Sequence, residues 1–137
     1  MNNSHSILGV DYGQKRIGLA LVSLDAKLPS PLKTLPNEDN LPQLLNELIK
    51  DKNVERIVLG LPRNLSGQDT EQTKIVRDFG ESLVRTTNLP VDFQDEALTS
   101  TKAEEELRAR GKPYAKEDVD ALAATYILED WLKDNEI

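Results

Sequence analysis

The chain of 137 residues contains no cysteine and only one histidine. The absence of cysteine excludes a disulfide framework and any zinc site built on thiolate ligands. The single histidine, His5, lies in a polar N-terminal segment, residues 1–5, which we expect to be a flexible tail. A mechanism that depends on a histidine base is therefore not expected.

Long apolar runs and a targeting segment are missing too. No basic region precedes the first apolar residues, so we do not expect a signal peptide. The longest uncharged apolar stretch elsewhere runs from Ala121 to Leu128, far short of the roughly 20 residues that a membrane helix needs. We therefore expect a soluble, cytoplasmic protein that has no membrane partner.

The chain is acidic, with a formal net charge of −7 and an isoelectric point near 4.8. This balance argues against a protein that coats nucleic acid nonspecifically, because such binding depends on neutralising phosphates. Basic residues in predicted turns and helix ends are nevertheless expected to form a local nucleic-acid-binding rim, the alternative being ordinary solvated surface charges. The residues predicted for this rim, with one loop amide, are Lys15, Arg16, Arg63, Asn64, Lys102, Arg110 and Lys112.

Apolar periodicity alternates between strand and helix along the chain. The first two strands form a predicted hairpin, for which Gly13 and Gly18 permit a tight turn. The third helix is expected to begin at a capping box around Thr101. The second is expected to bury an apolar face made of Ile75, Val76, Phe79, Leu83 and Val84. The predicted strands are 6–11, 17–23, 31–35, 56–60 and 91–95, and the predicted helices begin near residue 40 and cover 69–87, 101–111 and 117–134.

This order of elements predicts an α/β fold in one domain over 1–137. The expected core is a mixed five-stranded sheet, with three antiparallel N-terminal strands and two further parallel strands, flanked by helices. In such sheets functional groups gather beyond the carboxyl ends of the parallel strands. Because Asp11, Gly60 and Glu96 end three predicted strands, we expect them at one edge of the sheet.

Three carboxylates lie at positions that favour a catalytic role. Asp11 follows the first predicted strand, Glu96 follows the last, and Asp120 lies in the first turn of the predicted final helix. Carboxylates that lie together repel each other unless cations lie between them, and oxygen-only ligand sets favour Mg²⁺ or Mn²⁺. The pattern is typical of a two-metal site for phosphodiester hydrolysis. We predict these three residues as the catalytic residues and the metal ligands.

Neighbouring acids are distinguished by their positions. The two alanines one turn after Asp120 have small side chains, which let the helix approach the sheet. Asp118 lies at another angle around the helix and is expected to supply favourable charge at its N-terminus, a role that also competes for Asp120. Asp95 and Glu96 are adjacent on a strand, so they face opposite sides and only one is expected to reach the site.

Four ordered motifs give the chain a family resemblance. They are Asp-Tyr-Gly-Gln-Lys-Arg-Ile-Gly at 11–18, Gly-Leu-Pro-Arg-Asn-Leu-Ser-Gly at 60–67, Asp-Glu-Ala-Leu-Thr-Ser at 95–100 and Val-Asp-Ala-Leu-Ala-Ala at 119–124. Over nearly the whole chain they resemble the YqgF family, also called RuvX-like or pre-16S ribosomal RNA nucleases. The resemblance implies a ribonuclease-H-like fold akin to Holliday-junction resolvases. It also implies a metal-dependent nuclease site at Asp11, Glu96 and Asp120 and a role in maturing the 5′ end of 16S ribosomal RNA.

The sequence departs from the family pattern at two positions. An arginine usually follows the Asp-Glu pair, whereas Ala97 stands here, so a phosphate contact or ion-pair partner is missing or supplied elsewhere. Related resolvases place an acid at the end of the fourth strand, where this chain has Gly60. The predicted site therefore requires Glu96 to take the place of that acid in space.

These observations predict a nuclease that hydrolyses phosphodiesters in structured RNA, with pre-16S ribosomal RNA expected, or in branched DNA. The alternatives are a Holliday-junction-type DNA resolvase and a non-cleaving, RNA-binding factor for ribosome assembly, which the acidic surface and Ala97 favour. An ATPase of the actin or sugar-kinase type, with Asp11 in the nucleotide site, is less compatible, because that architecture duplicates the fold and this chain has room for one copy.

Overall fold

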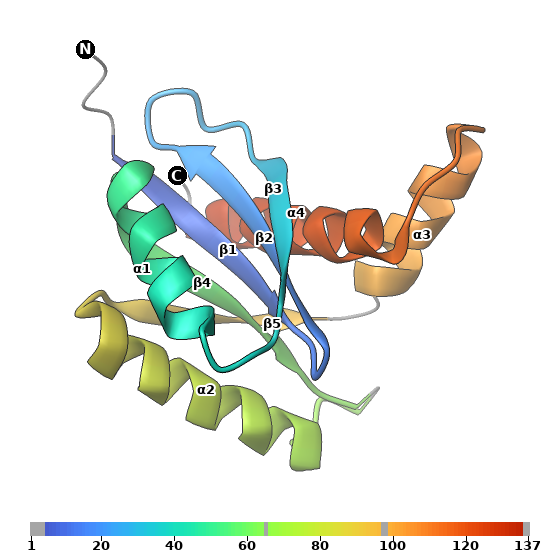
Figure 1. Ribbon diagram of the computed structural model, residues 1–137. Coiled ribbons are helices and arrows are strands. Elements are labelled where there is room, and N and C mark those ends of the chain that lie inside the picture. The colour runs from blue at the N-terminus through green and yellow to red at the C-terminus, as the bar shows by residue number, and fades with distance from the viewer. Residues whose placement is uncertain (1–4, 65, 97–98, 136–137) are drawn as a thin grey trace.

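The computed structural model of the protein describes residues 5–64, 66–96 and 99–135 (Figure 1). Of the predicted tail, 1–5, only His5 is among them, and its carbonyl accepts a hydrogen bond from Leu24 N at 3.1 Å. Ala97 lies outside the described residues. Within the described ranges, no helix is both long and apolar enough to cross a membrane.

Five strands form one sheet in the order β3-β2-β1-β4-β5. Strand β2 pairs antiparallel with β1 and β3, and β4 pairs parallel with β1 and β5. The predicted mixed sheet is confirmed, since three antiparallel N-terminal strands are followed by two parallel ones. The strands are β1 (Ser6–Tyr12), β2 (Arg16–Ser23), β3 (Ser30–Pro36), β4 (Val54–Pro62) and β5 (Val91–Glu96).

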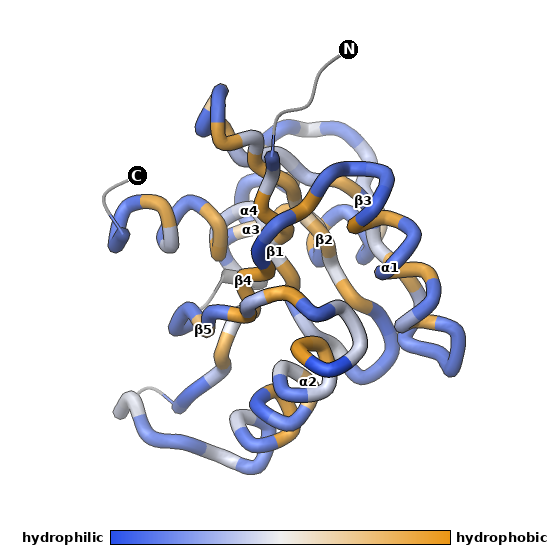
Figure 2. The backbone as a smooth tube through the Cα atoms, turned by 90° about the vertical axis from the view of Figure 1, so that its left-hand side faces the viewer, coloured by the Kyte–Doolittle hydropathy of each residue, from blue (hydrophilic) through white to orange (hydrophobic). Residues whose placement is uncertain are grey.

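Helices cover both faces of this sheet (Figure 1). One face packs against α1 (Leu41–Asp51) and α2 (Glu71–Thr87), and the other against the long helix α4 (Lys116–Asp134). Helix α3 (Thr99–Ala109) packs on α4 and projects from the body of the molecule. Figure 2 shows that apolar residues concentrate in the central strands and on the inner sides of the helices.

Alternation of side chains along the central strands divides the core into two layers. In β1, Leu8 and Val10 pack on the side of α1 and α2. Ile7 packs on the other side, against residues of α4 such as Ile127. Asp11 is an even number of residues from Ile7, so the same alternation directs its side chain to the α4 face.

The buried face of α2 agrees with the predicted one at Val76 and Leu83 but differs at Ile75 and Val84. Ile75 and Val84 are 39% and 44% exposed, whereas Val76, Gly80 and Leu83 are buried. The buried residues recur at spacings of three and four along one line of the helix, and each exposed residue lies one position, or about 100°, away from that line. The helix therefore contacts the sheet through a narrower stripe than its apolar composition indicates.

The predicted start of α3 is also wrong. The helix begins at Thr99, so Thr101 lies inside it. The capping-box pattern from Thr101 to Glu104 therefore does not mark the start of the helix. Strand β5 ends at Glu96 and α3 begins three residues later. This short connection, rather than the local pattern, sets where the helix starts.

Candidate active site

Helix α4 carries Asp120 to Asp11 because β2 has a glycine at the crossing point. Asp11 is paired with Gly18 in the antiparallel register of β1 and β2. A Cβ added at Gly18 would collide with the backbone carbonyl of Asp120, so α4 rests directly on the strand near its N-terminal end. One turn later, Ala124 is fully buried against the sheet, as the prediction of a close approach requires, whereas Ala123 is buried against α3. Gly18 therefore lies within β2, not in the predicted turn.

A second glycine opens the way between Glu96 and Asp11. Strand β4 lies between β1 and β5, and its Gly60 pairs with Gln94 of β5, two residues before Glu96. A Cβ added at Gly60 would lie 3.0 Å from Glu96 Oε2 and would also collide with Ile127. Since Gly60 has no side chain, the Glu96 carboxylate extends over β4 toward Asp11.

Strand β4 runs to Pro62, two residues past the predicted end, so Gly60 is not the exit of the strand. Its function in the structure is to leave space above the sheet. This placement supports the expectation that Glu96 reaches the position that an acid on the fourth strand would otherwise fill.

Glu96 and Asp120 lie close enough to Asp11 for their charges to act on its carboxyl group. Burial raises the pKa of the Asp11 carboxyl well above its ordinary value of 3.8, and the charge of Glu96, a hydrogen bond with Glu96 and the charge of Asp120 raise it further. Each of these effects disfavours the ionised form. Asp11 and Glu96 therefore form a hydrogen-bonded carboxyl pair, and Asp120 is close enough to act on it.

Asp120 is bound by an arginine. Arg16 Nε donates a hydrogen bond of 2.6 Å to Asp120 Oδ2, and this bond and the charge of Asp120 raise the pKa of the Arg16 guanidinium. Among the residues that the structure describes, no three acidic or histidine side chains are gathered closely enough to hold one metal ion. The structure thus brings two carboxylates into contact and holds the third nearby on an arginine.

The neighbouring acids behave as their positions predict. Asp95 is exposed and forms an ion pair of 3.3 Å with Arg63, on the side of β5 away from Asp11. Asp118 Oδ2 accepts a hydrogen bond of 2.9 Å from Ala115 N, which satisfies a backbone donor at the start of α4. Its role is that of a helix cap, as the sequence indicates.

Arg63 and Asn64, two residues of the predicted rim, are engaged in their own loop. Arg63 Nε lies 3.1 Å from Asp69 Oδ1, in addition to its contact with Asp95. Asn64 Oδ1 accepts hydrogen bonds from Ser66 N and Gln68 N at 3.0 and 2.9 Å. These contacts shape the segment after β4 and leave the two side chains less available to a ligand.

Other rim residues are spread over α3 and its exit. Lys102 Nζ lies 4.4 Å from the centroid of the Tyr126 ring, a cation–π contact that joins α3 to α4. Arg110 forms an ion pair of 3.0 Å with Glu106. Lys15, in the turn between β1 and β2, lies at the site end of the sheet beside Arg16.

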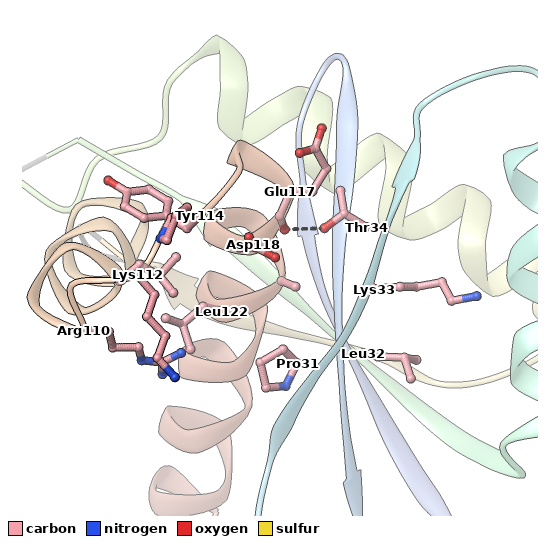
Figure 3. A pocket seen from close by; sticks show the side chains of 13 residues that line it. Pro31, Leu32, Lys33, Thr34, Arg110, Lys112, Tyr114, Glu117, Asp118 and Leu122 are labelled. Atoms are coloured by element: carbon pink, nitrogen blue, oxygen red, sulfur yellow. Dashed lines mark hydrogen bonds between the residues drawn. The ribbon is translucent and has the colours of Figure 1, made fainter.

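A groove of about 350 Å³ lies between β3, the α3–α4 connection and α4 (Figure 3). At one end Thr34 Oγ1 donates a hydrogen bond of 2.7 Å to the carbonyl of Glu117. The side chains of Arg110 and Lys112 point toward the other end, opposite Pro31. Of the residues predicted for the rim, Lys15 and Arg16 therefore lie at the acidic site, whereas Arg110 and Lys112 form a separate basic end of this groove.

Sequence reasoning missed the roles of Gly18 and Gly60 and the pairing of Arg16 with Asp120. A signal was present for the glycines, because both interrupt otherwise apolar strands, where glycine often marks a close approach of another segment. No local signal connects Arg16 to Asp120, since the two are 104 residues apart.

Known proteins share both the sequence and the fold. The RuvX family model, described as a Holliday junction resolvase, matches residues 5–134. A protein of Chloroflexus aggregans named "Putative pre-16S rRNA nuclease" is 38% identical over 135 residues, covering 95% of this chain and 94% of that protein. A protein of Maridesulfovibrio salexigens with the same name is 40% identical over 130 residues, covering 92% of this chain and 96% of that protein.

Two solved resolvases have the same arrangement of strands and helices. RuvC of T. thermophilus, in complex with a Holliday junction substrate, superposes with a TM-score of 0.61 at 14% identity, covering 96% of each chain. The Fowlpox virus resolvase, in complex with Holliday junction DNA, gives 0.55 at 12% identity, covering 95% and 98%. These likenesses show the fold, that of RuvC-like ribonuclease H proteins. With a family model matched over almost its entire length and relatives that share more than a third of its residues, the chain belongs to the RuvX family.

Proposed function

We propose that this protein is a metal-dependent nuclease that hydrolyses phosphodiester bonds in structured RNA, with Asp11, Glu96 and Asp120 as its catalytic carboxylates. One observation carries the proposal: Asp11, half-buried at the carboxyl end of a parallel strand pair, is hydrogen-bonded to Glu96 and lies under the charge of Asp120. The name of the two relatives supports pre-16S ribosomal RNA as the substrate and maturation of its 5′ end as the role.

The cost of this arrangement to folding is a reason to assign it a function. A carboxylate that loses water and faces two like charges destabilises the folded state. That cost is removed when divalent cations are bound, and a ligand set made only of carboxylate oxygens suits Mg²⁺ or Mn²⁺. The donor chemistry of Asp11, Glu96 and Asp120 therefore fits such cations.

Each residue has a distinct part in the proposed site. Bound divalent cations supply activation of a water molecule and stabilisation of the leaving oxygen. Asp11 would hold them from β1, Glu96 from the β5 side and Asp120 from the α4 side. Gly60 keeps the space between the strands open, and Asp95 faces away from it.

Two surfaces offer positive charge to a nucleic-acid backbone. Lys15 and Arg16 lie beside the carboxylates at the turn between β1 and β2. Arg110 and Lys112 lie at the basic end of the groove beside β3 (Figure 3). We propose that the first pair contacts phosphates near the scissile bond and that the second contacts a more distant part of the substrate.

Branched DNA is the second candidate substrate. The description of the family model as a Holliday junction resolvase favours it. The two substrates are separated by presenting a pre-16S RNA fragment and a four-way DNA junction to the same preparation, each with Mg²⁺ and with Mn²⁺.

The decisive measurement is single-turnover cleavage by two variants of adjacent acids. Glu96→Gln should slow cleavage by roughly 100-fold or more, because stabilisation by the metal site amounts to several kcal/mol, while RNA affinity stays nearly unchanged. Asp95→Asn is the matched control on the same strand and should retain cleavage. Equal activity of the two variants would contradict the assignment of Glu96. No cleavage of either substrate by the wild type, with RNA binding retained, would favour the non-cleaving assembly factor.

A further inference from the structure

The contact between Arg16 and Asp120 joins the first residue of β2 to the fifth residue of α4. Its Nε to Oδ2 distance of 2.6 Å is that of a short, charge-assisted hydrogen bond. The Asp120 side chain is 19% exposed and that of Arg16 is 32% exposed, so the pair is partly shielded from water. Partial shielding makes such a pair less sensitive to solvent screening than an ion pair on the open surface.

The position of this pair places the positive charge of Arg16 next to the predicted catalytic carboxylates. Asp120 lies beside Gly18, whose strand partner is Asp11. The guanidinium of Arg16 is therefore close to the group of three predicted carboxylates, which we call the acidic cluster. In the described residues the three carboxylates do not converge on a single point. The one held by an arginine is the one that is not in hydrogen-bond contact with Asp11.

We propose that Arg16 occupies the place of a cation at Asp120 and competes with the divalent metal for that carboxylate. The inference rests on the proposed function only in taking Asp120 as a metal ligand. Metal binding then requires an exchange in which Asp120 leaves the guanidinium and turns to the cation. Arg16 is thus a positioning residue that sets the metal affinity of the site. Once released, its guanidinium has N–H donors available for phosphate oxygens.

The direction of the effect separates this role from a simple structural one. If Arg16 competes with the metal, its removal frees Asp120 and removes a repelling positive charge, so the metal binds more tightly. If Arg16 instead fixes Asp120 in the geometry that the metal needs, its removal weakens binding. We expect Arg16→Gln to bind Mn²⁺ about tenfold more tightly than the wild type, which corresponds to about 1.4 kcal/mol.

The chain offers a matched control pair. Arg56 Nη1 lies 3.0 Å from Asp92 Oδ1, and the Arg56 side chain is 37% exposed, close to the value for Arg16. Asp92 precedes Glu96 by four residues on β5, which is about 13 Å along an extended strand. Arg56→Gln therefore removes the same charge from the same kind of pair away from the site, and it should leave Mn²⁺ affinity unchanged.

The experiment is a calorimetric titration of Mn²⁺ into the full-length wild type, Arg16→Gln, Arg16→Lys and Arg56→Gln, with Asp11→Asn to identify binding at the acidic site. Arg16→Lys keeps the charge and should bind Mn²⁺ as the wild type does. Tighter binding in Arg16→Gln alone supports the competition. Unchanged or weaker binding in Arg16→Gln overturns it and leaves the proposed nuclease intact.

Other outcomes are equally decisive. Absence of Mn²⁺ binding in every protein, or binding that Asp11→Asn does not affect, contradicts both this inference and the metal site of the proposed function. Thermal unfolding gives a second measurement on the same proteins. Without metal, Arg16→Gln should melt at a lower temperature than the wild type, and Mn²⁺ should raise its melting temperature by a larger amount. Equal metal-induced shifts in the two proteins would overturn the competition.

Discussion

Asp11→Asn tests whether repulsion among the carboxylates of Asp11, Glu96 and Asp120 destabilises the folded, metal-free protein. Asparagine has nearly the same shape as aspartate, carries no charge and can donate a hydrogen bond to the Glu96 carboxylate. It removes the group whose ionised form is disfavoured by burial and by two neighbouring carboxylates. The metal-free protein should therefore become more stable at neutral pH, although its cleavage activity is lost.

The size of the gain has an upper limit, because the folded protein can relieve the repulsion by protonating one carboxyl. A carboxyl with an ordinary pKa of 3.8 can be protonated at pH 7 for about 4 kcal/mol, at about 1.4 kcal/mol per pH unit. We expect the Asp11→Asn variant to be more stable by about 1–3 kcal/mol. For a chain of this length, that is a melting temperature higher by roughly 4–12 °C.

The gain should depend on pH with a definite sign. The pKa of Asp11 is raised in the folded state, so the folded wild type binds more protons than the unfolded chain between pH 3.8 and the raised value. Its stability therefore falls as the pH rises through this window. Asp11→Asn does not titrate there, so its advantage should vanish below about pH 4 and be complete above the raised pKa.

Thermal unfolding followed by circular dichroism, in a metal chelator at pH 4 and at pH 7, measures this difference. Addition of Mg²⁺ at pH 7 should then stabilise the wild type more than Asp11→Asn, because ligand binding to the folded state adds to stability. A melting temperature of the metal-free variant below that of the wild type at both pH values would make Asp11 a structural residue and refute the reasoning.

Three further predictions concern the space at Gly60 and the charges of the predicted rim. Gly60→Ala should lower the free energy of unfolding in urea by about 1–3 kcal/mol, since its Cβ would collide with Ile127 of α4 and lie 3.0 Å from Glu96 Oε2. An unchanged unfolding midpoint would show that the space at Gly60 is large enough for a methyl group. Replacing Arg110 and Lys112 together by glutamine should flatten the slope of log RNA affinity against log salt by roughly 1.4–1.8, the value for two lost phosphate contacts. Arg63→Gln should instead reduce stability and leave that slope unchanged, because the side chain is held by its own loop.

Much of the fold is predictable from the sequence because the local patterns agree with the tertiary structure. The central strands β1 and β4 read as continuous apolar runs, as strands covered on both faces do. The alternation that sets Asp95 and Glu96 on opposite sides follows from strand geometry alone. The three carboxylates are likewise identifiable from where they fall relative to strand and helix ends.

The remaining features depend on partners far away in the chain. Gly18 and Gly60 look in the sequence like residues of a turn and of a strand exit, and only the helix and the strand that cross above them show why a side chain is excluded there. Ile75 and Val84 fit an apolar helix face, but the width of the contact with the sheet decides which residues are buried. Local periodicity contains no information on that width.

The arginines at the site end of the sheet are neutralised by the chain's own carboxylates. Arg16 is bound to Asp120 at 2.6 Å, and Arg63 contacts Asp69 and Asp95 at 3.1 and 3.3 Å. A chain with a net charge of −7 that has already paired these arginines offers little free positive charge to phosphate at this end. If Arg16 competes with the metal as proposed above, divalent cations neutralise the carboxylates and at the same time release Arg16. The positive charge that a polyanionic substrate requires is then acquired together with the metal, so that an acidic protein gains its affinity for nucleic acid at the place where cleavage occurs.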